Sequence, residues 1–168
     1  VSESDFYLLL VVDIITKFFY NEVESEDDLM HTIQIPVRYQ ETDMMGIVYH
    51  ANYLVYLEIA RTELLRELGV EYKDMEQAGF VSPVTNVSVD YKKSVTFGDT
   101  VNVRVWVDSY SKIRTVYGYE LTDQDGHLVG TAKTTHVVVK QGDFKPVRLD
   151  REFPEWHEMY MRVMSPVS

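Results

Sequence analysis

Residues 52–68 read NYLVYLEIARTELLREL, and this is the most regular helical pattern in the chain. Apolar side chains recur in it at steps of three and four residues, namely Tyr53, Leu57, Ala60, Leu64 and Leu68. Side chains at this spacing share one face of an α-helix, so the segment predicts a helix with a single buried stripe. Gly69 follows directly, and glycine very often ends a helix. We therefore expect a long helix over residues 52–68 that packs on a core.

Much of the remaining sequence is typical of β-strands. Four segments rich in Val, Thr and Tyr follow the long helix, at residues 80–91, 100–109, 115–123 and 128–140. Phe97-Gly98-Asp99 and Asp125-Gly126 are turn signals between segments. A strand over residues 32–37 precedes the helix, and residues 72–77 and 151–163 favour two further helices. A long helix followed by antiparallel strands predicts an α+β domain, with the helix packed across one sheet face.

The composition limits the classes of protein to which the chain can belong. Its 168 residues suffice for one domain with its own core, and 45% of them are hydrophobic. The formal net charge of -11 argues against a nucleic-acid partner and against an anionic membrane surface. The chain has no cysteine, which excludes disulfides, a thiolate nucleophile and cysteine-based zinc sites and fits a cytoplasmic location.

The first 29 residues differ from the rest of the chain. Residues 6–12 form an apolar run that continues to residue 20, interrupted by Asp13 and Lys17. Two charges in so short a run argue against a membrane span, which needs about 20 mostly apolar residues. We expect residues 1–29 to form an extension, a helix plus an acidic linker, before a domain over residues 30–168. The alternative is a leader ahead of a domain that starts at Met30.

The segment just before the long helix carries the most informative chemistry. Residues 39–54 read YQETDMMGIVYHANYL, which places Asp43, Gly46 and His50 within eight positions of one another. The first backbone N–H groups of a helix have no partner within the helix, and they stabilise negative charge. A carboxylate beside them, such as that of Asp43, can act as a general base or as a nucleophile. Spacing alone does not decide between a catalytic Asp43 and a structural turn residue, because aspartate is also common in turns.

Other catalytic signatures are missing from the sequence. It has no Gly-x-Ser-x-Gly elbow, no phosphate-binding loop, no dinucleotide fingerprint and no paired-histidine zinc helix. Residues 123–126, DQDG, resemble the start of a calcium-binding loop but lack its third acidic position and closing glutamate, so we expect a turn. Four histidines have no metal-ligand spacing: His31, His127, His136 and His157. We expect no metal and no redox cofactor.

From about residue 31 to residue 148 the chain resembles the hotdog-fold acyl-CoA thioesterases of the 4-hydroxybenzoyl-CoA thioesterase type. The matching text is VRYQETD at residues 37–43, GIVYHANYL at residues 46–54, Glu58, and ARTE at residues 60–63. Weaker matches follow at residues 89–91, 98–99 and 145–148. The chain is most similar to the small bacterial branch often associated with the Tol–Pal cell-envelope system. The resemblance implies a hotdog fold, in which an antiparallel sheet wraps around a long central helix.

The resemblance also implies roles for individual residues. Asp43 matches the catalytic aspartate, as base or nucleophile, and His50 lies where a backbone N–H polarises the thioester carbonyl. The His50 imidazole is expected to help orient substrate or water. The other residues expected to line the substrate site are Tyr39, Gly46, Tyr49 and Glu58.

Basic residues near the nucleotide phosphates of CoA are a further implication of the resemblance. Lys112 and Arg114 lie where relatives place these basic residues, and Lys92 and Lys93 are the alternatives. For each of the four, the other interpretation is a solvated surface charge with no role in binding. Met44 and Met45 replace the smaller residues often found before the glycine, where they either line an acyl pocket or fill space.

The implied reaction is hydrolysis of an acyl-CoA thioester to a free acid and CoA. Relatives place the active site at a subunit interface, so a homodimer or a homotetramer is expected. One alternative is the same fold acting on acyl carrier protein thioesters, which the net charge of -11 makes less favourable. The other is a non-catalytic acyl-CoA-binding or scaffold protein. Asp43 distinguishes them, because a binding protein has no need of a carboxylate at the thioester.

Overall fold

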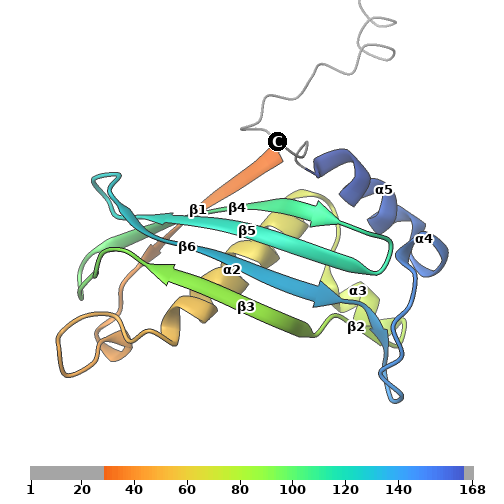
Figure 1. Ribbon diagram of the computed structural model, residues 1–168, viewed down its shortest axis with the longest axis horizontal. Helices are drawn as coiled ribbons and strands as arrows, with labels where there is room; N and C mark the ends of the chain where they lie inside the picture. The colour runs from red at the N-terminus through yellow and green to blue at the C-terminus, as the bar shows by residue number, and fades with distance from the viewer. Residues whose placement is uncertain (1–28, 165–168) are drawn as a thin grey trace, which may run out of the picture.

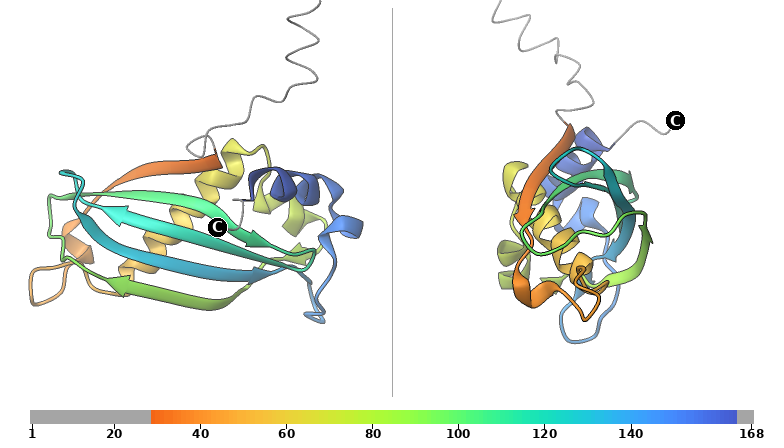
Figure 2. Two further views of the ribbon diagram at one scale, coloured as in Figure 1. Left: turned by 45° about the horizontal axis from the view of Figure 1, so that its top comes forward. Right: turned by 90° about the vertical axis from the view of Figure 1, so that its left-hand side faces the viewer.

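The long helix expected from the sequence is α2 (Asn52–Glu67), and it lies against the inner face of a five-stranded antiparallel sheet (Figure 1). The strands are β1 (Met30–Pro36), β3 (Val84–Tyr91), β4 (Thr100–Tyr110), β5 (Arg114–Thr122) and β6 (Leu128–Val137). Their order across the sheet is β1-β4-β5-β6-β3. Seen end-on, the strands curl around the helix (Figure 2). The predicted α+β arrangement of a central helix wrapped by an antiparallel sheet is confirmed.

This computed structural model describes residues 29–164. The expected helix and acidic linker of the N-terminal extension fall outside the described residues, so they stay a prediction. No helix between residues 29 and 164 is long and apolar enough to cross a membrane.

The core forms where α2 meets the inner face of β4. Four residues of the predicted stripe, Tyr53, Leu57, Ala60 and Leu64, are all buried, whereas Leu68 lies just beyond the helix and is half-buried. Four valines alternate along β4 and are fully buried: Val101, Val103, Val105 and Val107. Alternation puts every second side chain of a strand on one face. Each such side chain stabilises the fold by about 1.5–3 kcal/mol on burial.

Two of the expected strands are each broken into two pieces. The segment 80–91 becomes β2 (Phe80–Val81) and β3, and the segment 128–140 becomes β6 and β7 (Val139–Lys140). Pro83 lies at the first break, and a proline has no N–H to donate to a strand ladder. Beyond the breaks β2 and β7 leave the main sheet together and pair with each other as a two-stranded sheet.

The two shorter helices lie where the sequence predicts them, but the second is divided in two. The short helix over residues 72–77 is confirmed as α3 (Tyr72–Gln77). The expected helix over residues 151–163 is two helices, α4 (Leu149–Glu152) and α5 (Pro154–Val163). Pro154 explains the break, since a proline is tolerated at the first position of a helix but disrupts its interior.

Candidate active site

The loop before α2 is anchored by Glu41, which is 4% exposed. Its carboxylate accepts hydrogen bonds from the Arg38 guanidinium at 2.7 Å and from the Tyr56 hydroxyl at 2.8 Å. The side chain of Asn52 donates to the Glu41 carbonyl oxygen, also at 2.8 Å. Burial by itself raises the pKa of Glu41, but the bonds from Arg38 and Tyr56 outweigh it and leave that pKa lowered. Sequence reasoning gave Glu41 no role, although it lies inside the quoted motif.

Asp43 closes a tight turn in this loop. Its Oδ1 accepts the N–H of Met45 at 2.8 Å, and its carbonyl oxygen accepts the N–H of Gly46 at 2.9 Å. Gly46 has a φ of 76°, a conformation that favours glycine. The second carboxylate oxygen, Oδ2, has no hydrogen-bond partner within residues 29–164. Asp43 is therefore a turn residue with one carboxylate oxygen bonded in the turn and the other without a partner among the described residues.

The start of α2 leaves backbone donors without acceptors. The N–H of Tyr49 bonds to the Glu41 carbonyl at 2.8 Å, and the N–H of Asn52 bonds to the Tyr49 carbonyl at 2.9 Å. In the described part of the chain, no acceptor is found for the N–H of His50. A helix N-terminus of this kind is suited to an anion or to a developing oxyanion.

A pocket of about 240 Å³ collects these groups. It is lined by Asp43, Met45, Ile47, Val48, His50, Tyr53, Tyr91, Lys92, Lys93 and Ser94. The first five come from the loop, and the last four come from the end of β3 and the turn after it. We call it the Asp43 pocket. It brings together Asp43 and His50, the two catalytic candidates, with the two alternative basic residues.

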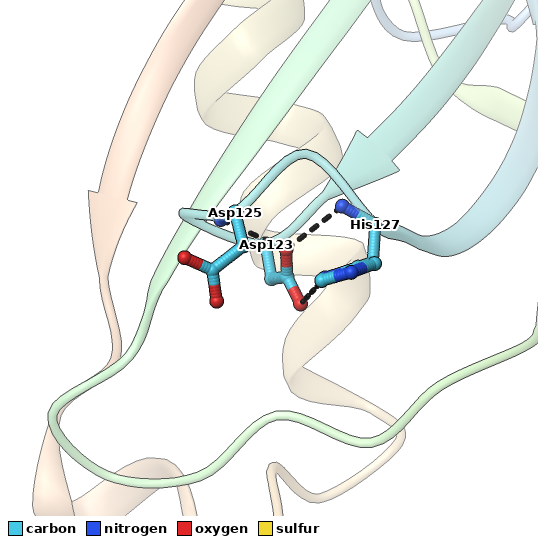
Figure 3. Close-up of side chains that lie close together, drawn as sticks. All are labelled: Asp123, Asp125 and His127. Atoms are coloured by element: carbon cyan, nitrogen blue, oxygen red, sulfur yellow. Dashed lines mark hydrogen bonds and ion pairs between the residues drawn. The ribbon is translucent and has the colours of Figure 1, made fainter.

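Lys93 is held in this pocket by an ion pair with Asp123. Asp123 lies in the turn between β5 and β6, where its Oδ1 also accepts the N–H groups of Asp125 at 3.0 Å and His127 at 2.9 Å (Figure 3). The Lys93 ammonium, with the hydrogen bonds from His127 and Asp125, holds the pKa of Asp123 well below its usual range. Asp123, Asp125 and His127 are close enough to share a cation, but the Asp123 carboxylate is already bonded within the protein. The expected turn is confirmed.

Several expected site residues lie away from the Asp43 pocket. Glu58 lines a second pocket farther along α2, and Tyr39 is 77% exposed with its ring against Phe97. Tyr49 is exposed and its ring is 4.3 Å from that of His50.

Lys112 and Arg114 lie at the opposite end of the sheet. Lys112 pairs with Asp150 at 3.1 Å, and Arg114 starts β5 beside Val137 at the end of β6. Lys92, by contrast, follows Tyr91, which pairs with Gly130 near the start of β6. Within one chain, only the two alternative lysines are near Asp43.

The second pocket lies between α2 and the first half of β3, and we call it the α2–β3 pocket. Its volume is about 530 Å³, and Arg61 lies in its lining with a side chain that is almost fully buried. Sequence reasoning quoted Arg61 only as part of the matching text. A charged residue at a helix position next to the buried stripe was the signal that could have drawn attention to it.

Comparison with known proteins bears directly on this architecture. The thioesterase-like superfamily matches residues 37–157, which is most of the chain. The chain belongs to this family. The match covers α2, both pockets and all of the sheet except β1.

Individual relatives are named as thioesterases as well. YneP of Bacillus subtilis, which is named for acyl-CoA thioesterase activity, is 46% identical over 127 residues, covering 76% of this chain and 92% of the relative. The acyl-CoA thioester hydrolase YbgC of Escherichia coli is 29% identical and covers 69% of this chain and 88% of its own length. The crystal structure of a DHNA-CoA thioesterase from Staphylococcus aureus superposes with a TM-score of 0.78 at 46% identity, covering 80% and 90%.

These matches confirm the hotdog acyl-CoA thioesterase family, the fold and the hydrolase activity expected from the sequence. The assignment to the branch often associated with the Tol–Pal system, the cytoplasmic location and the oligomeric state stay predictions. So do the roles of the individual site residues.

Proposed function

We propose that the chain hydrolyses acyl-CoA thioesters in the Asp43 pocket, using the Asp43 carboxylate and the backbone N–H of His50. One observation supports these roles above the rest. Oδ2 of Asp43 and the N–H of His50 lack partners among the described residues, and both residues line one pocket at the start of a helix. A free carboxylate oxygen and a free backbone N–H just before a helix can act as the base and the oxyanion donor for addition to a carbonyl.

The chemical steps follow from these two groups. Asp43 takes a proton from water, the hydroxide adds to the thioester carbonyl carbon, and the His50 N–H stabilises the oxyanion. The C–S bond then breaks, and the CoA thiolate takes the proton from Asp43. In the alternative course, Asp43 attacks the carbonyl carbon itself, the C–S bond breaks, and the CoA thiolate leaves and takes a proton from solvent. Water then cleaves the resulting anhydride into the free acid and the Asp43 carboxylate. Both courses use the same carboxylate and the same oxyanion donor.

A homodimer paired through β3 is part of the proposal. β3 is an edge strand of eight residues, and all but one of its side chains are exposed, unlike those of the inner strands. Such an edge offers unpaired backbone groups to another strand. Apolar side chains continue from β3 onto the outer face of α2, each 39–49% exposed: Leu54, Val55, Ile59, Val84, Val87 and Tyr91. An apolar patch of this kind marks an association surface.

Two-fold antiparallel pairing of β3 would also bring the expected site residues together. In such a pair, the Tyr91 end of one strand lies beside the Val84 end of the other. The Asp43 pocket is at the Tyr91 end, whereas the α2–β3 pocket with Glu58 is at the Val84 end. Lys112 and Arg114 share the Val84 end. The dimer would therefore complete each Asp43 pocket with these groups from the other subunit.

Aromatic acyl-CoA esters are the first candidate substrates. Relatives are named for 1,4-dihydroxy-2-naphthoyl-CoA hydrolysis as well as for acyl-CoA hydrolysis in general. Lys92 lines the Asp43 pocket and forms no ion pair among the described residues, so it can bind a CoA phosphate. An acidic carrier protein would meet the net charge of -11, so we favour CoA esters over carrier-protein esters.

The test is a thiol-release assay over a panel of acyl-CoA esters, including 1,4-dihydroxy-2-naphthoyl-CoA, with the wild type and Asp43→Asn. We expect the variant to keep its substrate affinity and to lose at least about a hundredfold in turnover. Asp74→Asn, at an exposed aspartate on α3, is the matched control and should retain full turnover.

Each other result has a definite reading. Unchanged turnover in Asp43→Asn would exclude Asp43 as the reacting group. Release of thiol only from acyl carrier protein esters would identify the carrier-protein thioesterase. Tight binding without release from any ester would identify a non-catalytic acyl-CoA-binding protein.

A further inference from the structure

Tyr53 is a buried tyrosine whose hydroxyl has no hydrogen-bond partner in the part of the chain that the structure describes. Its side chain is only 4% exposed. The other buried tyrosines are all paired: Tyr56 with Glu41 at 2.8 Å, Tyr117 with Tyr160 at 2.6 Å, and Tyr119 with Thr134 at 3.0 Å. Burying a hydroxyl without a partner is costly, so an unpaired one at a defined place in the fold requires a physical reason.

The hydroxyl of Tyr53 opens into the Asp43 pocket. Tyr53 is one of the residues that line this pocket, together with Asp43 and His50. Between residues 29 and 164, Nδ1 of His136 is the only fully enclosed side-chain nitrogen or oxygen without a partner, so the Tyr53 hydroxyl is unpaired but accessible. Because the Tyr53 side chain is otherwise buried, the pocket is where its hydroxyl meets solvent or a bound molecule.

The helix start and the edge strand together place Tyr53 beside the backbone of His50. Tyr53 is the second residue of α2 and His50 stands two residues before that helix, so the two are about one helical turn apart. The ring of Tyr53 meets that of Tyr91 edge-on, with centroids 5.1 Å apart, and the Tyr91 hydroxyl bonds to the His50 carbonyl at 3.0 Å. Two unpaired donors, the Tyr53 hydroxyl and the His50 N–H, therefore belong to one pocket of about 240 Å³.

The protonation state of Tyr53 makes it a hydrogen-bond donor and not a base. Burial raises the pKa of its hydroxyl above the ordinary value, and the nearby Tyr91 adds to the shift. The phenol is therefore neutral at pH 7 and has one O–H to donate.

Three acceptors could receive this O–H during the reaction: the Asp43 carboxylate, the attacking water and the thioester carbonyl oxygen. Asp43 does not accept it in the structure. A water that accepted it would become a poorer nucleophile, because the hydrogen bond would occupy a lone pair. The carbonyl oxygen gains negative charge as the nucleophile adds, so a hydrogen bond to it strengthens in the transition state and lowers the barrier.

We propose that Tyr53 is a catalytic residue whose hydroxyl donates a second hydrogen bond to the thioester carbonyl oxygen, alongside the N–H of His50. This inference rests on the proposed function, because it completes the oxyanion site used there. A carbonyl oxygen has two lone pairs, and one backbone N–H binds only one of them. The proton stays on Tyr53 throughout, so the bonds that form and break are those already given, and the thiolate takes its proton from Asp43 or from solvent.

The kinetic test is Tyr53→Phe, which removes the hydroxyl and keeps the ring. We expect kcat for an acyl-CoA ester to fall by about a hundredfold, the usual loss when one oxyanion donor is removed, while KM changes by no more than about twofold. The urea midpoint should not fall, because the deleted hydroxyl has no partner within the described chain. Tyr110→Phe, which deletes the hydroxyl bonded to His157 at 2.9 Å, is the matched control and should keep wild-type kcat.

An infrared measurement tests the same hydrogen bond without turnover. Phenacyl-CoA is a non-hydrolysable ketone, and the stretching frequency of its isotope-labelled carbonyl falls with each hydrogen bond that the oxygen accepts. We expect a lower frequency on wild type, Tyr110→Phe and Asp43→Asn than on Tyr53→Phe. That result would support the role of Tyr53 even if wild type hydrolysed no ester, so failure of the proposed reaction does not decide it.

Other results would overturn the inference. An equal carbonyl frequency on wild type and Tyr53→Phe would exclude a hydrogen bond from Tyr53 to the carbonyl, and a loss of turnover in Asp43→Asn would still support the proposed reaction. Wild-type kcat in Tyr53→Phe would exclude a catalytic role. A fall in both kcat and the urea midpoint, with the carbonyl frequency unchanged, would show that Tyr53 acts only on the fold.

Discussion

The hydroxyl of Tyr91 donates a hydrogen bond to the carbonyl oxygen of His50 at 3.0 Å. Tyr91 is the last residue of the edge strand β3, and His50 stands two residues before α2. The ring of Tyr91 also meets the ring of Tyr53 edge-on, with centroids 5.1 Å apart. His50, the residue whose N–H is expected to polarise the thioester, is therefore tied through its carbonyl group to the strand expected to form the dimer.

Tyr91→Phe should lower turnover while leaving the fold intact. The change removes one hydrogen bond at an exposed position, so the free energy of unfolding should fall by no more than about 1 kcal/mol. Turnover should fall by about tenfold, since an oxyanion donor depends on its exact placement. Steady-state kinetics and urea unfolding measure the two effects. The control is Tyr110→Phe, which removes the bond between Tyr110 and His157. Unchanged turnover in Tyr91→Phe would show that this bond to the His50 carbonyl does not position the His50 N–H.

Lys92→Ala should weaken CoA-ester binding more than Lys93→Ala does. Both lysines line the Asp43 pocket, but the Lys93 ammonium is already paired with Asp123, whereas no ion pair is found for Lys92 between residues 29 and 164. We expect KM for a CoA ester to rise several-fold in Lys92→Ala, with kcat little changed, and the rise to shrink at high salt.

The same assay on Lys112→Ala tests the original expectation from the family resemblance. Lys112 is paired with Asp150 at the other end of the sheet. If Lys112→Ala raises KM and Lys92→Ala does not, the phosphate site is the one expected from the resemblance and is supplied by the other subunit.

Val87→Lys should convert the dimer to a monomer. Val87 lies near the middle of β3, is 40% exposed and pairs with Thr134 of β6 on its inner side. A lysine on an edge strand opposes strand pairing, and two-fold symmetry would bring the two new charges close together. Light scattering coupled to gel filtration gives the mass, and the thiol-release assay should show loss of activity in the monomer. Thr32→Lys, on the other edge strand β1, is the control and should stay dimeric. A monomeric wild type would contradict the proposed assembly.

The helices and strands could largely be predicted from the sequence because the spacing of apolar side chains that defines them is a local property of the chain. Tyr53, Leu57, Ala60 and Leu64 repeat at the helical period, and the helix buries all four. The strand boundaries at residues 82–83 and 138 were missed because the segments on both sides have equal strand propensity. What separates them is Pro83 and the pairing of β2 with β7, two strands that lie far apart in the sequence.

The site was predictable only in part, for a related reason. Asp43 and His50 are seven residues apart, so their common pocket could be expected from the turn and the helix start between them. Glu41 binding to Tyr56 and Lys93 binding to Asp123 each join segments that only the folded chain brings together. No periodicity encodes such contacts.

Acid should destabilise the fold through His136. Its pKa is about 4 in the folded chain, compared with about 6.5 for an ordinary histidine, because of burial and then of the Arg61 charge. A lowered pKa means that the unfolded chain binds the proton first, so the contribution of His136 is complete above pH 6.5. It is lost as the pH falls from 6.5 toward 4, by about 2 kcal/mol between pH 7 and pH 5.

Urea unfolding of wild type and His136→Gln at pH 7 and pH 5 measures this loss. Glutamine cannot take up a proton, so the variant should lose less stability than wild type between the two pH values. His157→Gln, at a less buried histidine that bonds to Tyr110, is the control and should lose about as much as wild type. An equal loss in wild type and His136→Gln would mean that the buried imidazole is not the group that unfolding protonates. The acid sensitivity would then have to come from the carboxylates with lowered pKa, of which Asp123 and Glu41 are both buried near the active site.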